Sequence, residues 1–333
     1  MRSFLREYWA PAFAGVTACV GVTALLLATA ALAQHPWPAR PVTIIVPYPP
    51  GGSNDVFARE LGKKLSDAWK IPVVIDNRPG GGGSIGAALV ARAKPDGYTF
   101  CLLSSSFTTN AAVQKELPFD PVNDFAPVAM VAKGPMLLTV SNKLPVNSTL
   151  ELFALARKDP GKLNYGSSGV GSTNQFATEL LMDAAKIKMT HIPYKGMSPA
   201  ITDVIAGNVD VLIASAPSIY PQVKAGRVKA LGVTSAAAFA PIPDLRPVAQ
   251  MGAPGYTFEL WWGILAPKAT PPDIVIQANI DVNRILETPE MKQTFAHEGA
   301  EAAPMSAAAF AATIKREIEG WKSIAKAANI QAE

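Results

Sequence analysis

Short apolar runs and segments of helical periodicity alternate along most of the chain. Runs rich in β-branched residues predict strands at 42–46, 73–75, 98–103, 163–165, 192–194, 209–213 and 228–233. Apolar residues at helical spacing predict helices over 56–69, 85–93, 150–157, 176–184, 272–286 and 306–327. This alternation is typical of an α/β fold in which helices connect mostly parallel strands.

Two long apolar segments predict that the chain crosses twice between domains. Strand character extends over 125–140 and again over 255–267, in each case beyond the length of a single ordinary strand. Two crossings imply a discontinuous first domain. We therefore expect a bilobal protein with residues 34–134 plus 259–333 in one domain and residues 135–258 in the other.

The N-terminus has the pattern of a cleavable export signal. Basic residues precede an apolar run over 16–32, which ends in the small-x-small sequence Ala31-Leu32-Ala33. Cleavage there would leave Gln34 as the first residue of a protein located in the periplasm. A membrane anchor is the competing interpretation, although the run is short and rich in Ala and Thr. Cys19 leaves lipidation as a minor alternative.

Composition restricts the class of partner. Without residues 1–33 the chain is still long enough for two domains of roughly 150 residues each. The sequence carries a formal net charge of only +4, and its longest basic run is Lys63-Lys64. Because basic and aromatic residues are not interleaved, we expect no nucleic-acid partner. Cys101 lies in an apolar strand pattern, and we expect it to pack in the core.

A glycine motif raises the question of a dinucleotide cofactor. Gly81, Gly83 and Gly86 follow a predicted strand and open a helix, as in the G-x-G-x-x-G fingerprint. A nicotinamide site also needs an acidic residue at the end of the next strand to bind the ribose. Here that strand ends in Ser104-Ser105-Ser106. We therefore expect no cofactor.

The spacing of the histidine and serine residues matches neither a metal site nor a catalytic triad. His35, His191 and His297 do not pair at a metal-ligand spacing such as i, i+4. Serine hydrolysis favours a G-x-S-x-G turn, and Gly166-Ser167-Ser168-Gly169 does not have that spacing. We therefore predict no metal site and no catalytic residues.

Two loops share one physical design. The loops at 49–55 and 165–175 are rich in glycine and hydroxyl side chains, and each lies between a predicted strand and a predicted helix. The first turn of a helix has unpaired N–H groups and a partial positive charge, so it binds an anion without a basic side chain. For one loop an ordinary helix cap is the simpler explanation. Two such loops in different lobes favour an anion site.

Eight stretches carry a family resemblance through essentially the whole mature chain: 48–55, 77–83, 124–128, 159–167, 193–196, 207–210, 225–231 and 262–263. In this order the sequence resembles the tripartite tricarboxylate transporter receptor family, the TctC-like or Bug extracytoplasmic solute-binding proteins. The resemblance implies a bilobal Venus-flytrap fold, type II-like, with two mixed-sheet domains and two crossover segments. It also implies a monomeric receptor for a small carboxylate, which serves a tripartite tricarboxylate-type membrane transporter or a sensing function.

The resemblance also implies site residues. In the family the two loops hold one ligand carboxylate, which gives direct hydroxyl contacts to Ser53, Ser172 and Thr173 and supporting amide contacts to Asn54 and Asn174. The other candidates in or beside the loops are Tyr48, Gly51, Gly52, Asp55, Ser168 and Gly171.

Two of these positions need comment. A carboxylate at Asp55 would repel an anion, so we expect it to orient the loop donors or the helix start rather than contact the ligand. Gln175 stands where many family members have histidine, which leaves the local ligand preference open.

Two serines at strand ends complete the set of candidates. Ser105 ends a strand of the first lobe, where ligands of open α/β sheets usually bind, and Ser215 is its counterpart in the second lobe. The expected ligand is a di- or tricarboxylate, an acidic amino acid or an aromatic acid. The alternative function is a carboxylate-processing enzyme on the same bilobal scaffold.

Overall fold

The computed structural model describes residues 37–114, 116–327 and Ile330. The chain divides into two compact units, residues 1–39 and residues 40–333, and the second contains the helices and strands given below. The predicted export signal, Gln34 and His35 lie outside the described residues. Within the described ranges, no helix combines the length and the apolar character needed to cross a membrane.

The strands of the described chain form one mixed sheet. They are β1 (Val42–Val46), β2 (Val73–Asn77), β3 (Thr99–Ser104), β4 (Phe125–Ser141), β5 (Asn164–Ser167), β6 (Thr190–Pro193), β7 (Val211–Ser215), β8 (Val228–Val233), β9 (Glu259–Pro267) and β10 (Glu301–Ala302). Most of the predicted strands are confirmed, with ends that differ by one or two residues.

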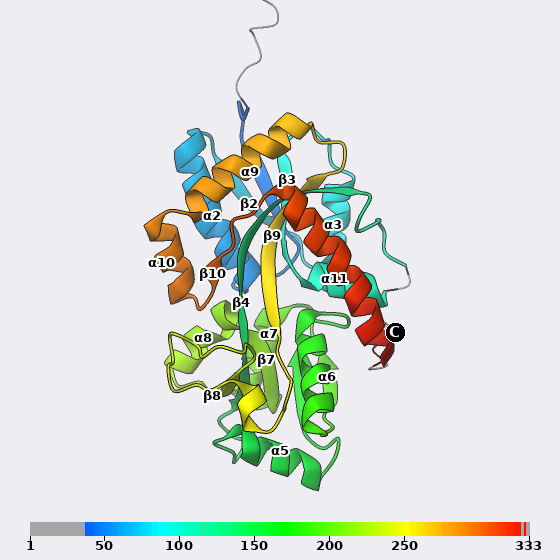
Figure 1. The fold of residues 1–333 in the computed structure, drawn as a ribbon, viewed down its shortest axis with the longest axis vertical. Helices are drawn as coiled ribbons and strands as arrows, with labels where there is room; N and C mark the ends of the chain where they lie inside the picture. The colour runs from blue at the N-terminus through cyan, green and yellow to red at the C-terminus, as the bar shows by residue number, and fades with distance from the viewer. Residues whose placement is uncertain (1–36, 115, 328–329, 331–333) are drawn as a thin grey trace, which may run out of the picture. The chain divides into compact units, whose positions relative to one another are not determined.

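Strand β4 joins two halves of this sheet. One half has the order β2-β1-β3-β9-β4, in which β1 runs parallel to β2 and β3, and β10 pairs with β4. The other half is built on the later part of β4, which lies between β7 and β8, and continues through β5 to β6. In Figure 1, β4 and β9 run side by side through the middle of this unit. The two predicted crossing segments therefore correspond to β4 and β9, and the proposed domain boundaries stay a prediction.

Helices cover both halves of the sheet (Figure 1). They are α2 (Ser53–Trp69), α3 (Ser84–Ala91), α4 (Ser106–Val113), α5 (Thr149–Lys158), α6 (Thr173–Ala185), α7 (Met197–Ala206), α8 (Ala216–Lys224), α9 (Pro272–Leu286), α10 (Pro289–His297) and α11 (Ala307–Ala327), with short 3-10 helices η1 (Gly81–Gly83) and η2 (Val248–Met251). Helices α2, α9 and α11 pack on the first half of the sheet, and α6, α7 and α8 pack on the second.

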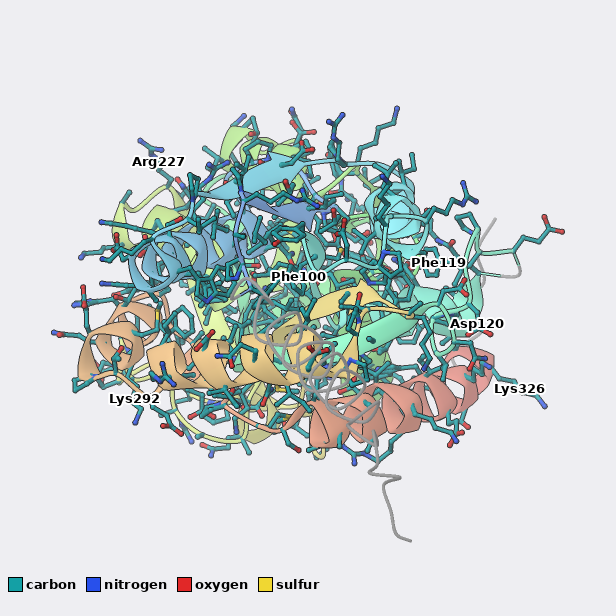
Figure 2. All side chains as sticks on the ribbon, turned by 90° about the horizontal axis from the view of Figure 1, so that it is seen from above. Phe100, Phe119, Asp120, Arg227, Lys292 and Lys326 are labelled. Carbon is teal, nitrogen blue, oxygen red and sulfur yellow. The ribbon has the colours of Figure 1, made fainter. Side chains whose placement is uncertain are left out.

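Each half has a buried apolar core. In the first half, the ring of Phe57 packs against Trp262 and Phe295, with centroid distances of 4.6 and 4.7 Å. In the second half, Leu212 and Ile219 belong to a cluster of buried aliphatic side chains. Cys101 is fully buried, as expected. Polar ends of long side chains stay outside, and Figure 2 shows Arg227, Lys292 and Lys326 extending away from the ribbon.

Four helices were not predicted, and one predicted apolar face is shifted. Helices α4, α7, α8 and α10 are each only eight to ten residues long, too short for the apolar periodicity to have indicated them. In α6, Leu180 and Ala184 are partly exposed, whereas Leu181 and Ala185 are buried. The buried face of α6 is thus rotated by one residue because Phe176 and Ala177 pack together toward the core.

The glycine motif has a packing role. A Cβ atom at Gly86 would lie 2.8 Å from the Pro47 Cα atom and 2.9 Å from the Arg78 carbonyl oxygen. Because both neighbours are backbone, helix α3 can lie this close to the end of β1 only with glycine at this position. This contact explains Gly86 without a dinucleotide.

Candidate functional site

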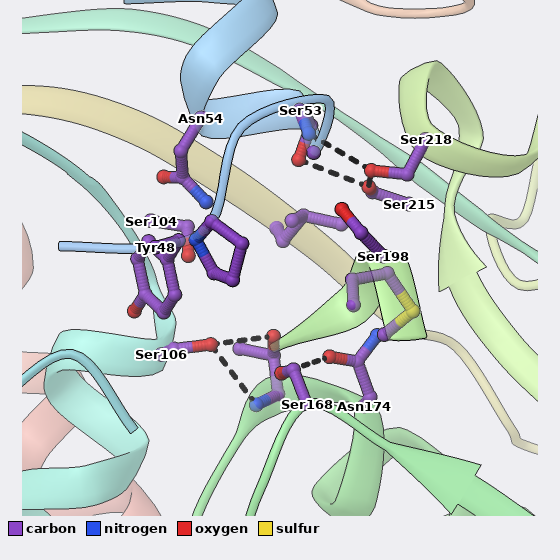
Figure 3. Close-up of a pocket in the computed structure, with 15 residues that line it drawn as sticks. Tyr48, Ser53, Asn54, Ser104, Ser106, Ser168, Asn174, Ser198, Ser215 and Ser218 are labelled. Atoms are coloured by element: carbon purple, nitrogen blue, oxygen red, sulfur yellow. Dashed lines mark hydrogen bonds between the residues drawn. The ribbon is translucent and has the colours of Figure 1, made fainter. Parts of the chain in front are cut away.

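The two predicted loops meet at one cavity. The first loop follows β1, which lies between its parallel neighbours β2 and β3, and the second follows β5, which lies between β7 and β6. Both positions are points where the strand order reverses, and ligands of open α/β sheets bind at the carboxyl ends of strands there. Figure 3 shows residues from both loops facing the same space.

The cavity is lined by hydroxyl, amide and a few apolar groups. Its lining residues are Tyr48, Pro49, Gly52, Ser53, Asn54, Ser104, Ser106, Ser168, Thr173, Asn174, Met197, Ser198, Ser215, Ser218 and Leu260. None of these lining residues of the described chain is charged. Burial raises the pKa of Tyr48 to about 12, so its hydroxyl is a neutral group here.

Five helices begin at this cavity. Lining residues occupy the first turn of α2 (Ser53, Asn54), α4 (Ser106), α6 (Thr173, Asn174), α7 (Met197, Ser198) and α8 (Ser218). Each helix start has N–H groups without a partner inside its own helix and contributes the equivalent of roughly half a positive charge. The cavity is therefore electropositive although it has no basic side chain, and an anion is the ligand that it favours.

One cluster of serines joins the two halves across the cavity. The backbone N–H of Ser53 donates to Ser218 Oγ over 2.9 Å. Ser215 Oγ lies 3.1 Å from Ser53 Oγ and 2.9 Å from Ser218 Oγ. The fully buried indole of Trp262 donates from Nε1 to Ser53 Oγ over 3.0 Å. Ser53 is thereby fixed by a residue of β9 and by residues of the second half.

A second contact joins the halves on the other side of the cavity. Ser106 Oγ lies 3.0 Å from Thr173 Oγ1 and accepts a hydrogen bond from the Thr173 backbone N–H over 3.3 Å. Ser198 Oγ donates to the Pro50 carbonyl oxygen over 3.0 Å. The cavity between these contacts has a volume of about 30 Å³, which is room for only one or two water-sized groups. A small organic acid enters only if these hydroxyl groups separate.

Asp55 supports the first loop from outside the cavity. Its carboxylate accepts hydrogen bonds from Gly51 N–H, Arg59 Nε and Asn77 Nδ2, each over 3.0 Å. Burial alone would raise the pKa of Asp55, but the hydrogen bonds from Arg59, Gly51 and Asn77 outweigh it and hold the pKa below its ordinary value. Asp55 therefore orients the loop, which is the role expected for it.

Hydrogen bonds within the second loop hold its conformation. Ser172 Oγ caps α6 by accepting from Gln175 N–H over 3.4 Å, and Gln175 Oε1 accepts from Gly171 N–H over 2.8 Å. Only half of the predicted capping box is present, because Ser172 caps the helix while Gln175 bonds to Gly171, one residue before the N-cap, and Ser172 N–H bonds to the Gly169 carbonyl oxygen. Ser168 donates to Asn174 Oδ1 over 2.7 Å, and Asn174 Nδ2 donates to the Ile213 carbonyl oxygen over 2.9 Å. Gln175 thus shapes the loop without lining the cavity.

The structure divides the predicted site residues into two groups. Those that line the cavity are Tyr48, Gly52, Ser53, Asn54, Ser168, Thr173, Asn174 and Ser215. Those outside the lining are Gly51, Asp55, Ser105, Gly171 and Ser172. Of the second group, Ser105 is buried at the start of α4 and Gly171 packs against Asn110.

Several lining residues were missed in the sequence. They are Ser104, Ser106, Met197, Ser198, Ser218 and Leu260. Ser104 and Ser106 flank the predicted Ser105, so the strand end was located correctly but the choice among three serines depends on the direction of each side chain. The others lie on α7, α8 and β9, where no sequence signal marked a site.

A serine and a histidine contact each other below the second loop. Ser167 Oγ lies 2.6 Å from His191 Nε2, and the His191 ring stacks on Tyr165. Burial lowers the pKa of His191 to about 4, so the ring is neutral at pH 7. Ser167 is fully buried and also bonds to Gly169 N–H, which makes it a support for the loop rather than an accessible nucleophile. In the ranges that the structure describes, no cluster of three His, Cys, Asp or Glu could hold a metal ion.

The fold is that of the periplasmic solute-binding proteins, and here it is built on a mixed α/β sheet. Within that class, the model of the tripartite tricarboxylate transporter family receptor (TctC) matches residues 57–330. The chain belongs to this family. Receptors of the family bind small carboxylates and work with tripartite transporters. The family and the fold class predicted from the sequence are thereby confirmed.

Relatives match the chain over nearly their whole length. BugT of Bordetella pertussis is 33% identical, over 93% of this chain and 97% of its own. Rpa4515 of R. palustris, solved with adipate, has a TM-score of 0.87 and 36% identity and covers 89% of this chain and 99% of its own. MatC (Rpa3494) from Rhodopseudomonas palustris, solved with bound malate, has a TM-score of 0.81 and 28% identity and covers 86% of this chain and 99% of its own.

Proposed function

We propose that this protein is a receptor that captures one small carboxylate in the cavity between the loops at 49–55 and 165–175. The observation that carries the proposal is the convergence of five helix starts on an uncharged cavity lined by hydroxyl groups. Such a site stabilises a carboxylate through charge-assisted hydrogen bonds. The adipate and malate found with two relatives support the same ligand class.

Paired ligands test this proposal. Titration calorimetry compares hexanoate, 6-hydroxyhexanoate, adipate and malate with the primary amide of each acid. Because helix starts favour a negative charge, we expect at least one carboxylate to bind and its amide to bind at least 10-fold more weakly, which is roughly one charge-assisted hydrogen bond. Equal affinity for acid and amide, or no binding of any acid, would reject a carboxylate receptor.

The protein acts as a receptor and not as an enzyme in this proposal. The buried position of Ser167 beside His191 supports it, because a nucleophile must be reached by its substrate. The alternative is a carboxylate-processing enzyme, and incubation with a bound carboxylate separates the two. We expect mass spectrometry to recover the acid unchanged after many hours. A product whose amount increases with the protein concentration and with the incubation time would establish the alternative.

The proposed location is the periplasm, after removal of residues 1–33. Relatives described as periplasmic support this location, and Ala31-Leu32-Ala33 supplies the cleavage sequence. The intact mass of protein from the periplasmic fraction should correspond to a chain that begins at Gln34. A membrane-bound product of full mass, or one with acyl chains on Cys19, contradicts the proposal.

The proposed partner is the membrane part of a tripartite tricarboxylate-type transporter, to which the receptor brings its ligand as a monomer. The proposed domains, residues 34–134 plus 259–333 and residues 135–258, would then separate to admit the ligand and close on it. We expect sedimentation to give the monomer mass. Small-angle scattering should show a smaller radius of gyration with a bound carboxylate than without it, and an unchanged radius at saturation contradicts the closing motion.

A further inference from the structure

A second, smaller cavity borders the carboxylate cavity in the first half of the structure. Tyr48 lines both of them. The other residues of the second cavity, called here the side chamber, are Pro47, Gly82, Gly83, Ser84, Ala87, Leu103, Phe107, Asn110, Leu117 and Phe119. Its volume is about 10 Å³, which is room for a single water-sized group.

Asn110 lines the side chamber and carries a buried acceptor oxygen, which also lies against Gly171. Asn110 is 5% exposed, and its Nδ2 donates to the Gly82 carbonyl oxygen over 2.7 Å. Because a carbonyl oxygen only accepts hydrogen bonds, this contact fixes which end of the amide is Nδ2. Asn110 Oδ1 is buried and, among the described residues, has no hydrogen-bond partner. Such groups are rare in folded proteins, since an unpaired buried acceptor is unfavourable.

Asn110 lies at a distance that a ligand can span. It follows Ser106 by one turn of α4, and Ser106 is the residue that contacts Thr173 at the carboxylate cavity. The four residues from Ser106 to Asn110 correspond to about 6 Å along the helix axis. A chain of about six carbon atoms that begins at the helix starts would therefore bring its far end past Tyr48 to Asn110.

The chemistry of the side chamber selects the far end of that ligand. No charged side chain lines it within the described chain. A second carboxylate would lose its water and face the lone pairs of Asn110 Oδ1, and an ammonium group would be buried without a counter-charge. A neutral hydrogen-bond donor satisfies the Asn110 oxygen, and a hydroxyl group also fits the volume.

We propose that the side chamber is a specificity subsite that selects a carboxylate whose far end carries an uncharged hydrogen-bond donor, such as a terminal hydroxyl group, over a dicarboxylate. This inference rests on the proposed function, because the first cavity must hold the ligand carboxylate. It assigns the role of specificity residue to Asn110 and places Tyr48 between the two parts of the ligand.

Three acids of equal chain length test the proposal on the wild-type protein. Hexanoate, 6-hydroxyhexanoate and adipate differ only in whether the far end is a methyl group, a hydroxyl group or a second carboxylate. We expect calorimetry to show 6-hydroxyhexanoate binding about 10-fold more tightly than hexanoate, as one hydrogen bond to a buried acceptor allows, and more tightly than adipate. Adipate binding as tightly as 6-hydroxyhexanoate overturns the subsite but leaves the carboxylate receptor intact.

A variant connects the selectivity to Asn110. Asn110→Leu should bind hexanoate and 6-hydroxyhexanoate with similar affinity. Asn142→Leu is the matched control, because Asn142 Nδ2 also donates to a glycine carbonyl oxygen, that of Gly226, over 2.8 Å, but at an exposed position. The control should keep the 10-fold preference.

The remaining outcomes also decide the proposal. A preference for 6-hydroxyhexanoate that survives in folded Asn110→Leu refutes the role of Asn110. If Asn110→Leu does not fold, the comparison of the three acids on the wild type still supports or overturns the subsite. Failure of all three acids and of malate to bind rejects the proposed function together with this inference.

Discussion

Replacing Thr173 by valine tests the carboxylate site with little change of shape. Thr173 is 2% exposed at the first position of α6, and its hydroxyl contacts Ser106 across the cavity. Valine has nearly the same volume and similar helix propensity but no hydroxyl group. The substitution therefore removes one proposed donor to the ligand carboxylate and leaves the backbone N–H groups of the helix start in place.

The expected loss follows from the kind of hydrogen bond. A hydrogen bond to a charged group contributes about 1.5–3 kcal/mol, so the affinity of Thr173→Val for a carboxylate should fall roughly 10- to 150-fold. Without ligand, the lost contact with Ser106 joins two neutral hydroxyl groups and contributes only about 0.5–1.5 kcal/mol. The melting temperature should therefore fall by no more than a few degrees.

A control variant on the same helix separates ligand binding from stability. Thr178 is fully buried and does not line the cavity, and its hydroxyl donates to the Asn174 backbone carbonyl oxygen over 2.8 Å. Thr178→Val loses one buried hydrogen bond, as Thr173→Val does, but no proposed ligand contact. Calorimetry with the acid that binds the wild type most tightly, and thermal melts of both variants, provide the assay. Wild-type affinity in Thr173→Val, or an equal loss in Thr178→Val, would refute the assignment.

Three further predictions concern the supports of the site. Asp55→Asn should lower the melting temperature at pH 7 but much less near pH 3, because the depressed pKa of Asp55 gives stability that is lost as the pH falls through that pKa. Equal decreases in melting temperature at both pH values would contradict this prediction. Since the pKa of His191 is lowered to about 4, the unfolded state binds more protons between about pH 6.5 and 4, and stability falls as the pH is lowered through that window. Urea titrations of His191→Gln should show a weaker fall in stability, and a fall as large as that of the wild type contradicts the reasoning. Gly86→Ala should destabilise the protein by about 1–3 kcal/mol through its backbone clashes. Gly62→Ala, whose Cβ atom would meet only side-chain atoms of Val73 and Ile75, should be nearly neutral in the same melts.

The sequence by itself determined the fold class and the family. The residue pattern located β1, β8 and α9 at their observed bounds, because the two strands are short, mostly apolar runs and α9 has buried apolar residues at helical spacing. It also located the two loops, since glycine and hydroxyl residues between a strand and a helix indicate a helix start at the end of a strand. Ordered matches to a known family then gave the ligand class expected from the resemblance.

The tertiary structure decided which polar groups meet. Helices α4, α7 and α8 were not predicted, and each of them begins at the cavity. They are short, and α8 contains Pro221, so local propensity does not favour them. Packing against the sheet makes them stable, which no local pattern reveals.

The same limit applies to single side chains. Of three consecutive serines at the end of β3, the sequence could not tell that Ser104 and Ser106 line the cavity and Ser105 does not. It also could not show that Asn110, within an unpredicted helix, lines a cavity together with Tyr48 and has an oxygen without a partner among the described residues. The sequence locates most strand ends to within one or two residues, because burial and turns act locally. The composition of the binding cavity depends on where five helix starts converge, and that is a property of long-range packing alone.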